Sequence, residues 1–198
     1  MRTIICVGAG PSLTKEDVIA CEIAGFSLMV VNGAFQFAYC PEYHYAADTR
    51  WWQRNYAYTQ ASSHKYSIQR SGRDEGHCEV WQMERGAAEG FNTHWPKLCT
   101  GYNSGFQAIN LAYLLRFRRV ILLGYDMKFG PNGEKHCHPD HPDYNPLDTT
   151  VGTWVRAFNK IAPMMKELGL KVVNATRDTD LECFSQVRLE ELLEEKTV

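Results

Sequence analysis

The N-terminus of the chain joins an apolar segment directly to a glycine-rich turn, and this junction constrains the fold more than any other feature. Residues 3–7 carry no charge and are rich in residues that favour strands. Gly8 and Gly10 follow at once, and glycine lets a backbone turn sharply and approach a ligand closely. Pro11 fixes a backbone torsion angle in the turn, and Ser12 offers a hydroxyl group. The segment therefore predicts a strand followed by a rigid turn.

The turn leads into a helix whose start is marked by Thr14 and Asp17, which have the spacing of a capping box. The unpaired amides at a helix N-terminus, together with the positive end of its dipole, favour phosphate. The segment is not a full dinucleotide fingerprint, because Thr14 and Lys15 stand where a third glycine is expected. Two interpretations stay open here: an anion site, and a tight turn that binds nothing.

Composition narrows the class of protein. The 198 residues suffice for one domain with a substantial core, and the formal net charge of −2 argues against a nucleic-acid partner. Seven scattered cysteines without a Cys-x-x-Cys pair are typical of a reducing compartment. No segment has the length of a membrane span. We therefore expect a cytoplasmic protein, and its surplus of aromatic residues leaves room for a face that joins two copies into a homo-oligomer.

Apolar segments with the pattern of strands alternate with segments of helical periodicity along most of the chain. Strands are expected at 3–7, 27–31, 43–47, 119–123 and 170–173. Helices are expected at 16–25, 34–39, 51–60, 104–117, 153–168 and about 185–195. Residues 61–97 break the pattern, with a hint of a strand only at 79–83, and are predicted to form an irregular insertion or lid. The alternation predicts a single nucleotide-binding α/β domain over 1–198, Rossmann-like, with a mostly parallel sheet covered by helices on both faces.

Each predicted strand ends in glycine or polar residues, which a parallel sheet would bring to one edge. The residues expected to line a nucleotide site there are Gly8, Gly10, Pro11, Ser12, Asn32, Asp48, Asn103, Ser104, Gly105 and Asp126. Several also have a purely structural interpretation: Asn32 as a turn former, Asp48 and Asp126 as helix caps, and Ser104 as an N-cap. Asn174, at the end of the last strand, is a further turn former. The convergence of five strand ends favours the nucleotide site.

In these motifs the chain resembles the bacterial sialyltransferases that use CMP-sialic acid, and the wider group of MptE-like (6-hydroxymethylpterin pyrophosphokinase-like) proteins. The resemblance rests on Gly8-Ala9-Gly10-Pro11-Ser12-Leu13, Asn32, Asn103-Ser104-Gly105, Leu123-Gly124-Tyr125-Asp126 and Asn174-Ala175-Thr176. It covers both ends of the chain and leaves 61–97 unmatched. It implies that the glycine turn and Asn32 line the nucleotide site, that Ser104 and Gly105 meet the phosphate and sugar, and that Asp126 lies at the nucleotide edge. Asp48 stands near an Asn that contacts the nucleotide in the sialyltransferases.

The chain departs from the sialyltransferase pattern at three positions. Ala9 replaces an Asn between the glycines, and Gly101 stands near the position of an Arg, so that contacts to the nucleotide or phosphate are removed. Lys128 takes the place of a Tyr after the Gly-x-Asp motif, either as a phosphate contact or as a solvated surface charge. Arg50 and Arg54, after the third strand, likewise either reach an anionic ligand or are surface charges.

Residues 136–141 read His-Cys-His-Pro-Asp-His, the densest cluster of titratable and metal-binding side chains in the chain. The resemblance implies a His in this loop that deprotonates the acceptor hydroxyl, a role that imidazole suits. His138 and His141 are equal candidates for this base. A metal site and a plain exposed loop are the other interpretations, and the spacing matches no standard zinc motif.

These features predict a transferase, glycosyltransferase-like and related to the sialyltransferases, that takes a nucleotide or nucleotide sugar as substrate without a firm cofactor or metal. Two alternatives stay open. One is an ATP-dependent pyrophosphokinase of the MptE-like kind, in which Asp48, Asp126 or Asp140 would help to hold Mg²⁺. The other is a non-catalytic module that keeps the fold for nucleotide binding or assembly.

Overall fold

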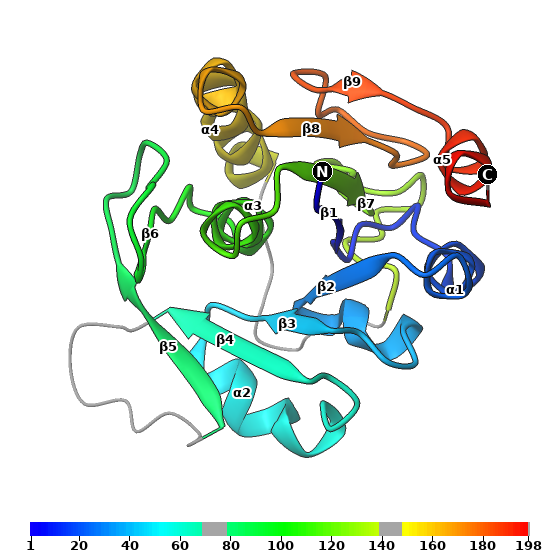
Figure 1. Ribbon diagram of the computed structural model, residues 1–198, viewed down its shortest axis with the longest axis horizontal. Helices are drawn as coiled ribbons and strands as arrows, with labels where there is room; N and C mark the ends of the chain where they lie inside the picture. Colours follow the sequence, from blue (N-terminus) through cyan, green and yellow to red (C-terminus); the bar gives the residue numbers. More distant parts are fainter. Residues whose placement is uncertain (69–78, 139–147, 198) are drawn as a thin grey trace.

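A computed structural model of the chain describes residues 1–68, 79–138 and 148–197. In these ranges nine strands form one sheet in the order β6-β5-β4-β3-β2-β1-β7-β8-β9, and every neighbouring pair is parallel (Figure 1). The strands are β1 Thr3–Val7, β2 Ser27–Val31, β3 Tyr43–Tyr45, β4 His64–Ile68, β5 Val80–Arg85, β6 Lys97–Leu98, β7 Arg119–Leu123, β8 Lys171–Asn174 and β9 Ser185–Gln186. The helices are α1 Lys15–Ile23, η1 Asn32–Phe37, α2 Thr49–Asn55, η2 Tyr56–Tyr58, α3 Ser104–Leu114, α4 Asp148–Glu167 and α5 Leu189–Thr197, where η1 and η2 are 3-10 helices.

Helices cover both faces of the sheet, as the sequence predicts. Figure 1 shows α3 and α4 on one side and α1 and α5 on the other. Phe106 of α3 and Phe158 of α4 are buried in one core, and Val18 of α1 and Leu192 of α5 are buried in a second. The tryptophans of α2 pack separately on Ala46 and Val80, beside β3 and β5. The predicted α/β architecture is confirmed.

The strand order places a topological switch between β1 and β7. From β1 the chain adds β2 to β6 successively on one side, and it then returns to place β7 to β9 on the other. Val7 at the end of β1 therefore has Val30 of β2 and Leu123 of β7 as its neighbours in register. In open parallel sheets ligands bind outside the carboxyl ends of the strands at such a point.

The structure differs from the sequence-based expectation in residues 61–97. Part of this segment extends the sheet, since β4 pairs with β3 and β5 pairs with β4, both in parallel. β4 buries four of its five residues, including Lys65 and Ser67. Such polar residues conceal a strand from a search for apolar runs. Residues 69–78 lie outside the described residues.

A second difference concerns the C-terminus, where residues 185–186 form strand β9 on the edge of the sheet. The last helix begins only at Leu189, although the sequence predicted it from about 185. Both residues of β9 are exposed, so they lack the apolar pattern that marks the other strands. Among the described helices, none has the length and apolar character needed to cross a membrane.

Candidate functional site

A pocket of about 540 Å³ lies outside the carboxyl ends of β1, β2, β3 and β7, at the topological switch. Ten residues predicted from the sequence line it: Gly8, Gly10, Pro11, Asn32, Asp48, Asn103, Ser104, Gly105, Asp126 and His138. Ser12 instead lines a second pocket of about 480 Å³, which lies on the side of α1 and α5. His141 and Asp140 lie outside the described residues. The structure thus brings most of the predicted residues together around one cavity.

The glycines of the turn after β1 allow this turn to pack closely against the turn after β7. The Gly8 amide donates to the Leu123 carbonyl at 2.8 Å, and the Gly10 amide donates to the Gly124 carbonyl at 2.9 Å. A methyl group on Gly8 would collide with the Gly124 oxygen, and one on Gly10 would collide with Asp126 Oδ1. Gly124 itself has φ +71°, which favours glycine. Both glycines of the turn are therefore required by β7, whether or not a ligand binds.

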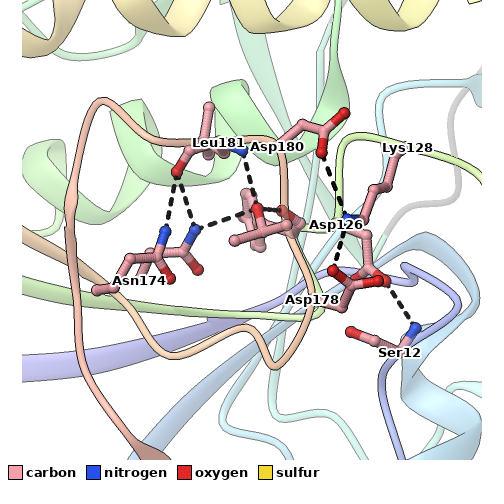
Figure 2. A network of polar contacts seen from close by, with 10 residues as sticks. Ser12, Asp126, Lys128, Asn174, Asp178, Asp180 and Leu181 are labelled. Carbon is pink, nitrogen blue, oxygen red and sulfur yellow. Dashed lines mark hydrogen bonds and ion pairs between the residues drawn. The ribbon is translucent and has the colours of Figure 1, made fainter.

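The carboxylate of Asp126 takes the place that an anionic ligand would take at the glycine turn. Its Oδ2 accepts a hydrogen bond from the Ser12 amide at 2.7 Å (Figure 2). The next amides are also committed, because Leu13 N donates to the Gly10 carbonyl and Thr14 N donates to Asp17 Oδ2. Asp17 N donates in turn to Thr14 Oγ1, which completes the predicted capping box. The amides of Ser12, Leu13, Thr14 and Asp17 are thus all paired with acceptors of the protein itself.

Asp126 also keeps one unmet acceptor. The residue is 2% exposed, and among the described residues its Oδ1 has no hydrogen-bond partner. Burial raises the pKa of this carboxyl, and the hydrogen bond from Ser12 N–H opposes the shift. Buried polar groups are normally paired, so this oxygen of a pocket-lining residue is a candidate contact for a ligand donor.

The histidine segment is tied to the glycine turn by a backbone hydrogen bond from Cys137 N to the Ala9 carbonyl, at 3.0 Å. His136 and His138 line the pocket, and their rings stack with centroids 5.1 Å apart. Cys137 between them packs on the core instead, and burial raises the pKa of its thiol to about 12. A methyl group on Gly33 would collide with His138 Nε2, so Gly33 makes room for this imidazole. No group of three metal-binding side chains is found within the described ranges.

Two predicted site residues serve as helix caps. Asp48 Oδ1 accepts from the Arg50 amide at 2.8 Å and begins α2, as the structural interpretation of Asp48 predicts. Asn103 Oδ1 accepts from the Phe106 amide at 3.1 Å and begins α3. The prediction of Ser104 as the N-cap is therefore wrong by one residue, because Ser104 is already the first residue of the helix. Both caps direct a helix N-terminus toward the pocket.

Helix α2 brings cationic side chains to the pocket. Arg50 and Arg54 are spaced one helical turn apart, and both line the cavity together with Trp51. Both arginines are exposed, whereas Trp51 is 9% exposed and packs edge-on against Phe35. This wall therefore carries two arginines and the carboxylate of Asp48, a net positive charge, whereas the glycine turn carries the carboxylate of Asp126.

His44 was not among the residues predicted from the sequence, and it supports the backbone of Asn32, which lines the pocket. Its Nε2 donates to the Asn32 carbonyl at 3.0 Å, and Asn32 has φ +49°, a left-handed conformation that is uncommon outside glycine. The ring is fully buried, and burial lowers its pKa to about 3. His44 is therefore neutral and holds the backbone from which Asn32 meets the pocket. Its place between two tyrosines was the sole sequence signal, and it suggests a core position.

The loop between β8 and β9 holds the turn after β7 in place through hydrogen bonds. Thr176 Oγ1 accepts from the Tyr125 amide at 2.9 Å, and Thr179 Oγ1 donates to the Tyr125 carbonyl at 2.7 Å. Asn174 is fully buried and donates to Thr179 Oγ1 and to the Leu181 carbonyl (Figure 2). Asn174 does not line the pocket; it supports the β7 turn as part of this loop.

Lys128 lines the pocket, but it forms ion pairs with acidic residues of the loop between β8 and β9. Its Nζ lies 2.5 Å from Asp178 Oδ1 and 3.4 Å from Asp180 Oδ1 (Figure 2). The hydrogen bond that Lys128 donates to Asp178 raises the pKa of Lys128 above its ordinary value. Lys128 is therefore ion-paired and not a purely solvated charge, and its contact with a phosphate stays a prediction.

The chain was also compared with known proteins. No protein-family model, no curated protein and no solved structure gives a significant match. The resemblance to the sialyltransferases and the MptE-like proteins therefore remains a prediction from the sequence.

Proposed function

We propose that the pocket binds a nucleotide or nucleotide sugar, and that the protein is a glycosyltransferase-like transferase related to the sialyltransferases. The observation that carries this proposal is the position of the cavity, outside the carboxyl ends of β1, β2, β3 and β7, where the strand order reverses. Its volume of about 540 Å³ is in the range of small-molecule sites. The mixture of aromatic, cationic and amide side chains around it suits a base, a phosphate and a sugar.

His138 is the candidate general base in this proposal, because it lies in the pocket beside Gly33. The acceptor hydroxyl would give its proton to the neutral imidazole while its oxygen bonds to the anomeric carbon of the donor. The bond from that carbon to the phosphate oxygen breaks, and the nucleotide leaves with the bonding electrons. The rest of the rate enhancement would come from holding donor and acceptor in line.

A thermal-shift screen tests the binding step, because a ligand that binds only the native state raises the melting temperature. The panel contains CMP, UDP, GDP and ATP with the corresponding nucleotide sugars, each with and without Mg²⁺. We expect a nucleotide or nucleotide sugar to stabilise the protein without Mg²⁺. Stabilisation by ATP only with Mg²⁺ would replace the proposal by the pyrophosphokinase alternative, and no stabilisation by any compound would refute it.

The catalytic step is tested by release of the nucleotide from the best donor. We expect His138→Ala to lower turnover about 100-fold or more, with little change in donor affinity. His94→Ala is the matched control, because His94 is exposed and does not line the pocket. Donor binding without turnover in the wild type would favour the non-catalytic module.

A further inference from the structure

Two parts of the pocket lining, the glycine turn and helix α2, differ in charge and in the hydrogen-bonding groups that they leave for a ligand. Near the glycine turn, the amides of Gly8, Gly10, Ser12, Leu13 and Thr14 all donate to acceptors of the protein itself. The Asp126 carboxylate sits at the same place. A phosphate here would find these amides already committed and would face another negative charge.

What this part of the lining does offer is a hydrogen-bond acceptor. Asp126 Oδ1 lies against Gly10, which lines the same cavity, and has no partner among the described residues. A ligand hydroxyl or amino group would satisfy the oxygen, whereas a ligand anion would not.

The wall formed by α2 offers different groups. Arg50 and Arg54 extend from one side of α2, and the planar guanidinium group matches the oxygen atoms of a phosphate or carboxylate. Trp51 lies on the same wall, nine-tenths buried, and its indole N–H has no hydrogen-bond partner within the described ranges. The wall therefore combines positive charge with an unsatisfied donor, and both favour an anionic group.

We infer that the pocket orients its ligand by charge, with an uncharged hydroxyl- or amino-bearing part at Asp126 and the anionic group toward Arg50 and Arg54. This inference rests on the proposed function and extends it to the direction of binding. It reverses the expectation that a glycine turn holds the phosphate. The substrate class is a nucleotide or acidic nucleotide sugar whose anionic group binds to the arginines of α2.

The test compares nucleotides with their nucleosides. Dissociation constants of CMP, UMP, GMP and AMP, of the four nucleosides, and of CMP-sialic acid as an acidic nucleotide sugar are measured for the wild type, for Arg50→Gln with Arg54→Gln, and for Asp126→Asn. We expect the arginine double variant to bind the nucleotide at least tenfold more weakly and to bind the nucleoside as the wild type does. Asp126→Asn keeps an oxygen for the Ser12 amide but presents an NH₂ group. We expect it to weaken nucleotide and nucleoside by the same factor of about ten.

A matched control separates contact from overall charge. Arg85→Gln with Arg116→Gln removes the same two charges from exposed positions that do not line the pocket, and we expect wild-type affinities. The Arg50 and Arg54 variant could instead bind nucleotides like the wild type and lose affinity for an acidic nucleotide sugar. This result would show that α2 binds the carboxylate of the sugar. That outcome still supports the charge orientation.

The inference is overturned if the Arg50 and Arg54 variant binds both the nucleotides and the acidic nucleotide sugar no more weakly than the control variant does. It is equally overturned if Asp126→Asn changes nucleotide binding alone. Circular dichroism and the melting temperature establish that each variant is folded. Failure of the proposed function is a separate result, in which the wild type binds none of the nine compounds, the nucleotide sugar included.

Discussion

Two sides of the pocket use their polar groups in different ways. The junction side, formed by Gly8, Gly10, Gly124 and Asp126, is held together by hydrogen bonds within the protein. A second set of lining residues, Arg50, Arg54, His136 and His138, which we call the open side, presents charge and imidazole groups to the cavity. The residues that look most like a phosphate site in the sequence therefore build the scaffold. The side chains suited to bind and react with a ligand come from elements on either side of it.

The largest effect is expected at the junction side, from Gly8→Ala. Its methyl group would meet the Gly124 oxygen, a backbone atom that cannot move without disturbing β7. We expect a loss of at least about 3 kcal/mol in the free energy of unfolding, measured by urea denaturation. Gly152→Ala is the control, because its methyl group would meet only the end of Arg156, at 3.4 Å, and helix propensity favours alanine. Equal stability of the two variants would contradict the packing role of Gly8.

The support beneath the open side is tested by the pH dependence of stability. The pKa of His44 is about 3 in the folded protein and about 6.5 in the unfolded chain, so the unfolded state binds the extra proton between these values. Folding stability should then fall by roughly 1.4 kcal/mol per pH unit as the pH drops from 6.5 toward 3, from this residue alone.

His44→Gln, which lacks the titrating group, should lose this part of the slope, whereas His94→Gln should keep it because His94 is exposed. Urea denaturation at pH 7.0, 6.0, 5.0 and 4.5 gives the slopes. The same slope in the wild type and in His44→Gln would show that His44 is not held neutral.

Gly33→Ala tests whether a change at the open side can alter turnover without altering the stability of the fold. The added methyl group would meet the far end of the His138 side chain, which can rotate away, so the free energy of unfolding should change by less than about 1 kcal/mol. Displacement of the imidazole should lower transferase turnover about 10- to 100-fold. Turnover by Gly33→Ala at the wild-type rate would argue against His138 as the base, and Gly152→Ala again serves as the control.

The smallest effect is expected from Lys128→Gln. The ion pairs of Lys128 with Asp178 and Asp180 involve acids that are more than half exposed, and such pairs contribute less than about 1 kcal/mol. The difference in melting temperature between this variant and the wild type should shrink in 1 M salt, because salt screens exposed charges. A large, salt-independent loss would mean that Lys128 has a structural role that its ion pairs do not explain.

The central part of the fold was predictable because its strands are continuous apolar runs. β1, β2 and β7 have the bounds expected from the sequence, and they carry the topological switch. The outer strands were not predictable in the same way. β4 buries Lys65 and Ser67, and β5 exposes Trp81, so neither strand shows the pattern that a buried or half-buried strand usually has.

The position of the site could be predicted from one rule, that parallel strands bring their carboxyl ends to one edge of the sheet. The roles of single residues could not be predicted from this rule. Asp126 was predicted near the ligand, but its bond to the Ser12 amide depends on how two turns pack. The link from His44 to Asn32 depends on the register of β2 and β3. Contacts of this kind join residues far apart in the chain or on different strands, and no local pattern specifies them.

Titration calorimetry with a pocket-blocking variant is the most direct test of nucleotide binding at the switch point. Ser104→Trp places a large side chain in the pocket at the start of α3, and Ser63→Trp places the same side chain at an exposed position outside it. The wild type and Ser63→Trp should bind the nucleotide or nucleotide sugar selected by the thermal-shift screen with equal affinity, and Ser104→Trp should bind it at least tenfold more weakly. Equal affinity in all three proteins would contradict the account, because the ligand would then bind elsewhere.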